Sequence, residues 1–122
     1  MSSVPSLDLA AVERLIVYHL DESVATPAAI RPEHLRNLTL ARRFESNDPR
    51  DIRDAYEATR AGKPAADSDD LDARWGVVFL SASREPLLAA YVDRFGVQGA
   101  INEDAVCFAY PALLHWLRGK FA

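Results

Sequence analysis

The sequence predicts a mainly α-helical fold, organised as a single-domain bundle of about five to six helices. Residues that begin and end helices recur along the chain: Asp48 followed by Pro49 is one such beginning, and Gly62 is its matching end. Between these signals, apolar residues recur three and four positions apart, the spacing that places side chains on one face of a helix. The two observations coincide in several segments, which is why we expect helices rather than strands.

A single domain is expected over residues 1–122. This length suits one domain with one core, and the 49% hydrophobic and 26% charged residues are typical of a globular protein. Cys107 is the single cysteine, so no internal disulfide can form, as is usual in a reducing compartment. The first residues lack the pattern of a secretory signal, and no apolar run reaches the roughly 18 residues of a membrane span. We therefore expect a cytoplasmic protein, and its high Ala and Arg content suggests a bacterial source.

Three helices are expected in the first half of the chain. Ser6 is suited to cap a helix over 7–20, because its hydroxyl can accept a hydrogen bond from an amide of the first turn. Pro32 suits the first turn of a second helix over 32–45, where a missing N–H costs nothing. The third helix, over 49–61, has the strongest signals and a narrow apolar stripe. The residues of that stripe are Ile52, Ala55, Tyr56 and Thr59.

Two further helices are expected in the second half, after one ambiguous segment. Residues 83–95 form a clear apolar face that Gly96 ends. Residues 103–118 form the last helix, and we expect Pro111 to kink or split it. Residues 75–81 suit either a helix or a short buried strand, because periodicity alone does not separate the two. The alternative fold class is therefore α+β, with a short strand near 75–81.

The last predicted helix is apolar on most of its sides. Cys107, Phe108 and Trp116 lie outside the row of side chains that we expect to face inward. Such a helix is either deeply buried or covered by a second chain. A homodimer through the helix 103–118 is therefore one assembly that the sequence permits.

Charge is unevenly distributed along the chain. Residues 45–72 carry nine carboxylates against four basic side chains, whereas residues 31–43 carry four arginines against one glutamate. The run 63–70 combines a proline, two alanines and three aspartates, a composition typical of a flexible acidic loop. An acidic helix followed by an acidic loop attracts basic protein partners at long range.

We interpret the chain as a small cytosolic protein-interaction module, because its size, its acidity and its lack of catalytic motifs all suit that class. An immunity protein, an antitoxin or an adaptor would have this character, with an acidic surface that contacts a protein partner. The candidate partner-binding residues are Asp48, Asp51, Asp54, Glu57, Asp67, Asp69, Asp70 and Asp72.

A nucleic-acid-binding regulator is the second hypothesis. Arg36, Arg42 and Arg43 would lie on the basic helix 32–45, and helix-turn-helix proteins contact DNA with a helix that follows a short connection. The formal net charge of -4 and the pI of about 5.3 weigh against this hypothesis, since nucleic-acid binding depends on clustered positive charge.

A small enzyme without a sequence motif is the third hypothesis. The chain has no phosphate-binding glycine loop, dinucleotide-binding turn, zinc-protease helix or nucleophile elbow. Its three histidines lack metal-ligand spacing, and Leu71 occupies a position that a calcium-binding loop fills with a polar ligand. We therefore expect no metal and no cofactor. Catalysis would need dispersed residues gathered by the fold, such as His34, Tyr56 and Asp70.

Overall fold

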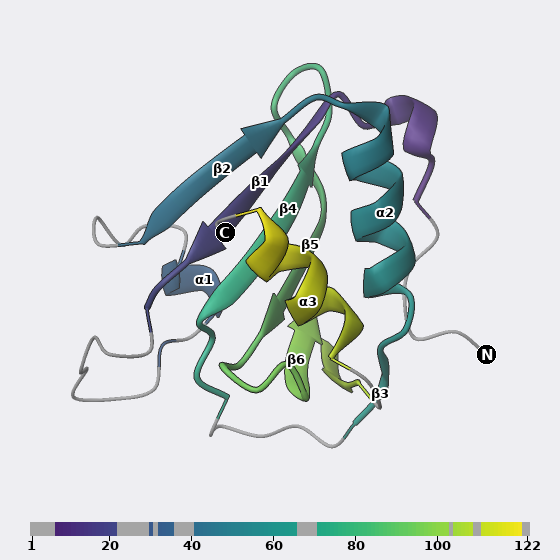
Figure 1. Ribbon diagram of the computed structural model, residues 1–122. Coiled ribbons are helices and arrows are strands. Elements are labelled where there is room, and N and C mark those ends of the chain that lie inside the picture. Colours follow the sequence, from purple (N-terminus) through teal and green to yellow (C-terminus); the bar gives the residue numbers. More distant parts are fainter. Residues whose placement is uncertain are drawn as a thin grey trace.

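The protein is a seven-stranded antiparallel sheet with two longer helices packed on one face (Figure 1). This computed structural model describes residues 7–21, 30, 32–35, 41–65, 71–102, 104–108 and 111–120. The predicted mainly α-helical bundle is therefore wrong, because most of the regular structure in these residues is β-sheet.

The elements follow one another along the chain in a mixed order. The strands are β1 (Arg14–His19), β2 (Arg42–Ser46), β3 (Lys63–Pro64), β4 (Trp75–Leu80), β5 (Pro86–Val92), β6 (Gln98–Ile101) and β7 (Asp104–Cys107). The helices are the short 3-10 turn η1 (Leu9–Ala11), α1 (Pro32–Leu35), α2 (Pro49–Thr59) and α3 (Ala112–Gly119). Within the sheet, the strands lie in the order β2-β1-β4-β5-β6-β7-β3, and each neighbouring pair is antiparallel.

The helix predicted over 49–61 is confirmed as α2. The Asp48 carboxylate accepts a hydrogen bond from the Arg50 amide at 2.9 Å, and Pro49 occupies the first turn. The stripe predicted to face the core is also confirmed, because all four of its residues are buried. This helix forms where it was expected because its start signal, its apolar stripe and its end lie within one short stretch of sequence.

The helices predicted over 7–20 and 32–45 are wrong. Residues 14–19 form β1, and the described part of the second segment contains the short helix α1 and strand β2. The β1 sequence, Arg-Leu-Ile-Val-Tyr-His, is rich in β-branched and aromatic residues, which suit a sheet. Because β1 bonds to β2 on one side and to β4 on the other, tertiary pairing outweighs the local helix-start signal.

The helix predicted over 83–95 is also wrong, because this segment contains β5. Arg84, with φ of 65°, lies in the turn between β4 and β5, and Gly96, with φ of 72°, lies between β5 and β6. Gly96 therefore shapes a hairpin turn and does not end a helix. The same residue types that stop helices also form hairpin turns, so the local signal was ambiguous.

The segment 103–118 is not one continuous helix. Pro111 immediately precedes α3, and residues 104–107 form β7, so the helix that Pro111 was expected to kink or split is wrong over its first half. Phe108 is buried, which accounts for part of the apolar surface that suggested a second chain. A homodimer along this segment stays a prediction. Its interface would be formed by a strand and a helix rather than by one apolar helix.

Strand β4 occupies the centre of the fold. All six of its residues are buried, so the strand alternative for 75–81 is confirmed. Burial on both faces of the sheet removes the alternation of apolar and polar residues that marks a half-exposed strand. This is why the sequence of β4 suited two interpretations equally well.

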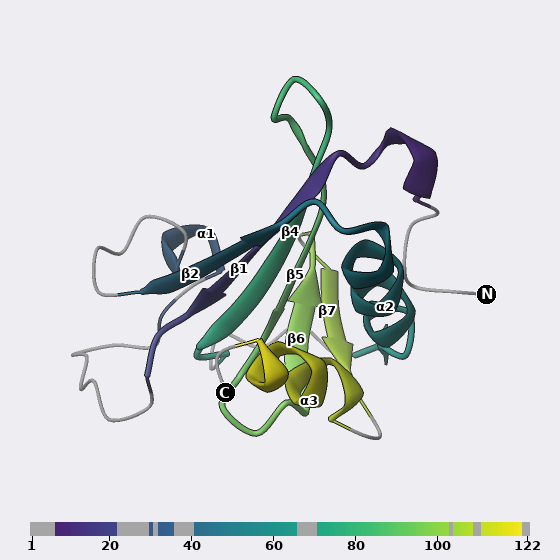
Figure 2. The same cartoon turned by 45° about the horizontal axis from the view of Figure 1, so that its top comes forward.

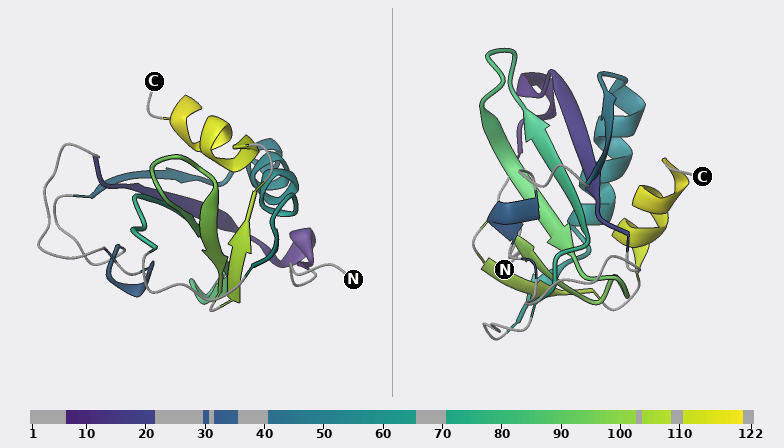
Figure 3. Two further views of the ribbon diagram at one scale, coloured as in Figure 1. Left: turned by 90° about the horizontal axis from the view of Figure 1, so that it is seen from below. Right: turned by 90° about the vertical axis from the view of Figure 1, so that its left-hand side faces the viewer.

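The two faces of the sheet carry different layers (Figure 3). On one face, Val17, Val77 and Phe79 belong to a large apolar cluster that includes the inner sides of α2 and α3. On the other face, Tyr18 and Val78 belong to a smaller cluster with α1. Figure 2 shows α2 and α3 together on their side of the strands. A side chain on β1 or β2 therefore faces either the α2 and α3 layer or the α1 layer.

Candidate interaction surfaces

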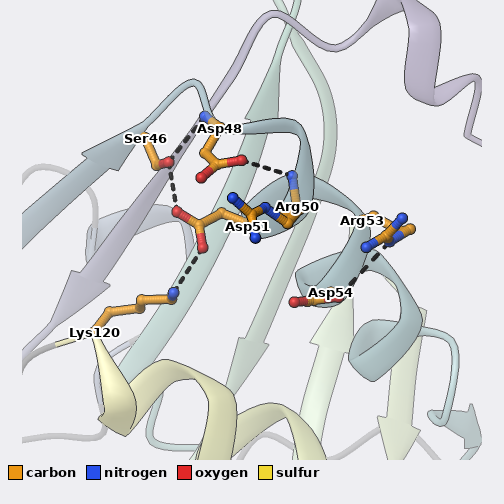
Figure 4. Close-up of polar contacts among 7 residues, drawn as sticks. All are labelled: Ser46, Asp48, Arg50, Asp51, Arg53, Asp54 and Lys120. Atoms are coloured by element: carbon orange, nitrogen blue, oxygen red, sulfur yellow. Dashed lines mark hydrogen bonds and ion pairs between the residues drawn. The ribbon is translucent and has the colours of Figure 1, made fainter.

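Asp48 and Asp51, two of the predicted partner-binding residues, stabilise the start of α2. Asp48 caps the helix, and Ser46 Oγ accepts a hydrogen bond from the Asp48 amide at 3.1 Å. The same hydroxyl donates to Asp51 Oδ2 at 2.7 Å. Figure 4 shows these three side chains converging where β2 leads into α2. Both carboxylates therefore have local structural roles.

Asp51 also connects α2 to the end of α3. Lys120 Nζ lies 2.7 Å from Asp51 Oδ1, and the side chains of the two residues are about three-quarters buried or more. The Lys120 ammonium also lies 4.9 Å from the centre of the Trp116 ring. The hydrogen bond from Lys120, together with that from Ser46, holds the pKa of the Asp51 carboxyl below its ordinary range. This contact joins parts of the chain 69 residues apart.

We predict that Lys120→Ala lowers the free energy of unfolding by about 1–2 kcal/mol at neutral pH, between the values for exposed and buried ion pairs. Because the folded pKa of Asp51 is depressed, its contribution is present above the ordinary value of 3.8 and is lost as the pH falls through the folded pKa. Urea unfolding of both proteins should thus give a smaller difference at acidic pH, where Asp51 is protonated in the folded protein, than at pH 7.

Arg53→Ala is the matched control for this pair. The Arg53 guanidinium lies 3.9 Å from Asp54, and both side chains are more than half exposed. Its loss should change the free energy of unfolding by less than about 0.5 kcal/mol. Equal losses of unfolding free energy in Lys120→Ala and Arg53→Ala would contradict the role given to Asp51. A Lys120→Ala effect that does not depend on pH would contradict it as well.

The outer face of α2 is balanced in charge. Asp54 and Glu57 are exposed, but Arg53 lies beside the first and Arg60 lies 3.7 Å from the second. Arg50 is exposed on the same helix. Asp54 and Glu57, which were predicted to make this helix acidic, therefore each have a basic neighbour on α2 or at its C-terminal end.

Asp72, another predicted partner-binding residue, bonds to its own chain. Its carboxylate accepts a hydrogen bond from the Ile30 amide at 2.7 Å and one from Arg74 Nε at 2.9 Å. Arg74 is buried and also donates to the Asp21 carbonyl. Asp67, Asp69 and Asp70 lie outside the described residues. In the loop predicted over 63–70, Lys63 and Pro64 form β3. Residues 66–70 lie outside the described part of the chain.

Two of the three residues of the nucleic-acid hypothesis lie on a strand, not on a helix. Arg42 and Arg43 are adjacent on β2, are exposed and face opposite sides of the sheet, and the Arg43 guanidinium lies 5.5 Å from the centre of the Tyr18 ring. Arg36 lies outside the described residues. The predicted basic helix 32–45 is therefore replaced by an edge strand that carries two of the three arginines.

Two arginines that sequence reasoning missed lie near the same edge. Arg14 and Arg84 lie 2.6 Å and 3.5 Å from Glu45 Oε1 on β2. The hydrogen bond from Arg14, reinforced by the charge of both guanidinium groups, lowers the pKa of the Glu45 carboxyl. No local signal could have found this cluster, because its members come from β1, β2 and the turn after β4.

The enzyme hypothesis named three residues, and the structure describes the side chain of one. Tyr56 is buried, and its hydroxyl accepts a hydrogen bond from the Leu7 amide at 3.2 Å. The His34 side chain and Asp70 lie outside the described part of the chain. Within the residues that are described, no three His, Cys, Asp or Glu side chains gather in a way that could hold a metal ion.

The turn between β5 and β6 presents an apolar surface that the sequence did not predict. Phe95 is 61% exposed and Val97 is 47% exposed, and the Arg94 guanidinium lies 4.7 Å from the centre of the Phe95 ring. An open pocket of about 490 Å³ adjoins this turn. The lining residues are Asp72, Asp93, Arg94, Phe95, Val97 and Gln98.

Asp93 determines the shape of this turn. Its Oδ1 accepts hydrogen bonds from the amides of Phe95 and Val97, each at 3.2 Å. The Gly96 amide bonds to the Asp93 carbonyl at 3.1 Å, and the positive φ of Gly96 completes the reversal. The two apolar side chains are therefore held outward by a hydrogen-bonded turn, and their exposure is a property of the fold.

No protein-family model, curated protein or solved structure matches this chain. None of the helices in the described ranges has the length and apolar character needed to cross a membrane.

Proposed function

We propose that this protein is a protein-binding module that contacts its partner through the turn between β5 and β6. The observation that carries the proposal is the outward placement of Phe95 and Val97 beside an open pocket. Exposed aromatic side chains and arginines are the residues that contribute most to protein interfaces, and Arg94 lies against Phe95. An immunity protein, an antitoxin or an adaptor would use such a surface.

The pocket indicates the chemistry of the partner. Asp72 and Asp93 contribute carboxylates to its lining, and Phe95 and Val97 contribute apolar surface. An apolar side chain with a basic neighbour on the partner would suit both features. In this proposal Asp72 would also contact the partner, in addition to its contacts with Ile30 and Arg74.

We predict that Phe95→Ala combined with Val97→Ser abolishes capture of the protein partner. Tagged wild-type and variant proteins would be recovered from the native host, and partners present in stoichiometric amount would be identified by mass spectrometry. Leu87→Ser is the matched control, because Leu87 is an exposed apolar residue, 38% exposed, on β5 outside the turn. Equal recovery of the same partner by all three proteins would contradict the proposal.

A nucleic-acid-binding function is the second candidate, and the cluster at the edge of the sheet favours it. Arg42 and Arg43 are exposed on β2, and Arg14 and Arg84 lie beside the Glu45 carboxylate of the same strand, so four guanidinium groups lie on or near this edge. Fluorescence anisotropy with labelled duplex DNA and single-stranded RNA, over a range of salt concentrations, separates the candidates. Salt-dependent binding that Arg42→Ala with Arg43→Ala removes would favour this function over the first.

A further inference from the structure

The pocket beside the turn between β5 and β6 is lined by two carboxylates that differ in their surroundings. The Asp72 carboxylate lies 2.9 Å from Arg74 Nε, and the Arg74 side chain is only 7% exposed. None of the ion pairs in the described ranges includes Asp93. The negative charge of Asp72 is therefore offset within the fold, whereas the charge of Asp93 is available to a group that enters the pocket.

The Asp93 carboxylate is held in one orientation by the turn. Its Oδ1 accepts hydrogen bonds from the amides of Phe95 and Val97, each at 3.2 Å. Its Oδ2 receives no hydrogen bond from the part of the chain that the structure describes. Because each carboxylate oxygen accepts hydrogen bonds, Oδ2 is an acceptor for a donor from outside the protein. An acceptor that is already fixed loses little conformational freedom when it binds.

Apolar surface lies beside this carboxylate. Phe95 and Val97 are largely exposed and line the same pocket, which has a volume of about 490 Å³. Arg94 carries the opposite charge to Asp93, but its guanidinium lies over the Phe95 ring, 4.7 Å from the ring centre. The pocket therefore offers apolar contact to the stem of an incoming side chain and one negative charge to its end.

We infer that the pocket takes a basic side chain of the protein partner, whose cation donates a hydrogen bond to Asp93 Oδ2. This inference rests on the function proposed above and adds which group of the partner is bound. Arginine and lysine both carry a cation at the end of an apolar stem, so the stem would cover Phe95 and Val97. An acidic side chain would be repelled by Asp93, and an apolar one would cover Oδ2 without supplying a donor.

NMR titration of the full chain, labelled with ¹⁵N, with two capped peptides tests this inference. In one peptide an arginine lies between two leucines, and in the other the arginine is replaced by citrulline, which has the same length and no charge. We expect the arginine peptide to shift the amide resonances of Phe95 and Val97 and to bind about fivefold more tightly or better, because hydrogen bonds between charged groups are the stronger ones. Added salt should reduce the difference between the two peptides.

Asp93→Asn removes the charge and preserves the turn, because the asparagine carbonyl oxygen can accept the two amide hydrogen bonds that Oδ1 accepts now. This variant should bind the two peptides with Kd values within about twofold of each other. Asp104→Asn is the matched control, since Asp104 is exposed at the start of β7 and pairs with Ile101, at the end of β6 away from the pocket. It should keep the preference for arginine.

The comparison of the two peptides on the wild-type protein does not depend on any variant, so its result stands even where Asp93→Asn disturbs the turn. Equal affinity of the wild type for the two peptides would overturn the inference, and so would binding of neither peptide at millimolar concentration. A folded Asp93→Asn protein that still prefers arginine would overturn it as well, because the cation would then be bound by another group.

The cation site and the proposed function fail separately. Partner capture that is lost in Phe95→Ala with Val97→Ser, without any preference for the arginine peptide, would support the partner-binding turn and remove the cation site. A preference for arginine that depends on Asp93, with partner capture unchanged in the turn variant, would support the cation site and contradict the proposed function.

Discussion

Gly99→Ala is expected to lower the free energy of unfolding by about 3 kcal/mol or more, or to prevent folding. A Cβ atom at this position of β6 would lie 2.3 Å from the Tyr91 carbonyl oxygen, closer than any non-bonded contact permits. The obstacle is main chain of the neighbouring strand β5, which cannot rotate away as a side chain can. Relief therefore requires separation of two paired strands.

Gly119→Ala is the matched control for this prediction. Nothing lies within 4 Å of a Cβ built at Gly119, which ends α3, so alanine there should be neutral or stabilise by up to about 1 kcal/mol. Urea unfolding followed by circular dichroism measures both variants. A Gly99→Ala protein as stable as wild type would contradict the pairing of β5 with β6, whereas a helical bundle with residue 99 in a connection would tolerate it.

Phe79→Ala is expected to lower the free energy of unfolding by about 3–5 kcal/mol. Phe79 is fully buried in the central strand β4, and the Tyr56 ring of α2 meets it edge-on at 6.4 Å between ring centres. Removing the ring leaves a cavity between the sheet and α2, and the surrounding strands are too well paired to close it. Thermal or denaturant unfolding gives the difference directly.

Phe95→Ala makes the same chemical change on the surface. Because Phe95 is mostly exposed in the turn after β5, its loss should alter the free energy of unfolding by less than about 0.5 kcal/mol. This result would also show that the turn variant used for partner capture remains folded. Comparable losses of unfolding free energy from Phe79→Ala and Phe95→Ala would contradict the central position of β4.

The accuracy of the sequence prediction depended on how far apart the interacting residues are. The α2 prediction succeeded because Asp48, Pro49 and the buried stripe act within one stretch of chain. The prediction for β1 failed because that strand is completed by β4, which lies far from it in sequence. The prediction for β5 failed because the turns on either side of this strand contain residue types that also begin and end helices. Gly96 was interpreted as the end of a helix, but the positive φ that suits a helix end also suits a hairpin turn.

The candidate surfaces show the same division. The sequence predicted that Arg42 and Arg43 form a basic segment, and both are exposed together on β2. Their neighbours Arg14 and Arg84 could not be predicted, because a sheet and a hairpin turn bring them there. The apolar turn at Phe95 was missed because the predicted helix 83–95 placed that ring in the core.

By itself, the sequence determined what is local: the position of α2 and the change from basic to acidic residues after Arg43. Only the tertiary structure decided how the charges are used. Asp51 is bound by Lys120 across 69 residues, whereas Phe95 is turned outward by the Asp93 carboxylate. The physical reason is that capping and composition act along the chain, while strand pairing, burial and ion pairing depend on which distant segments the sheet brings together.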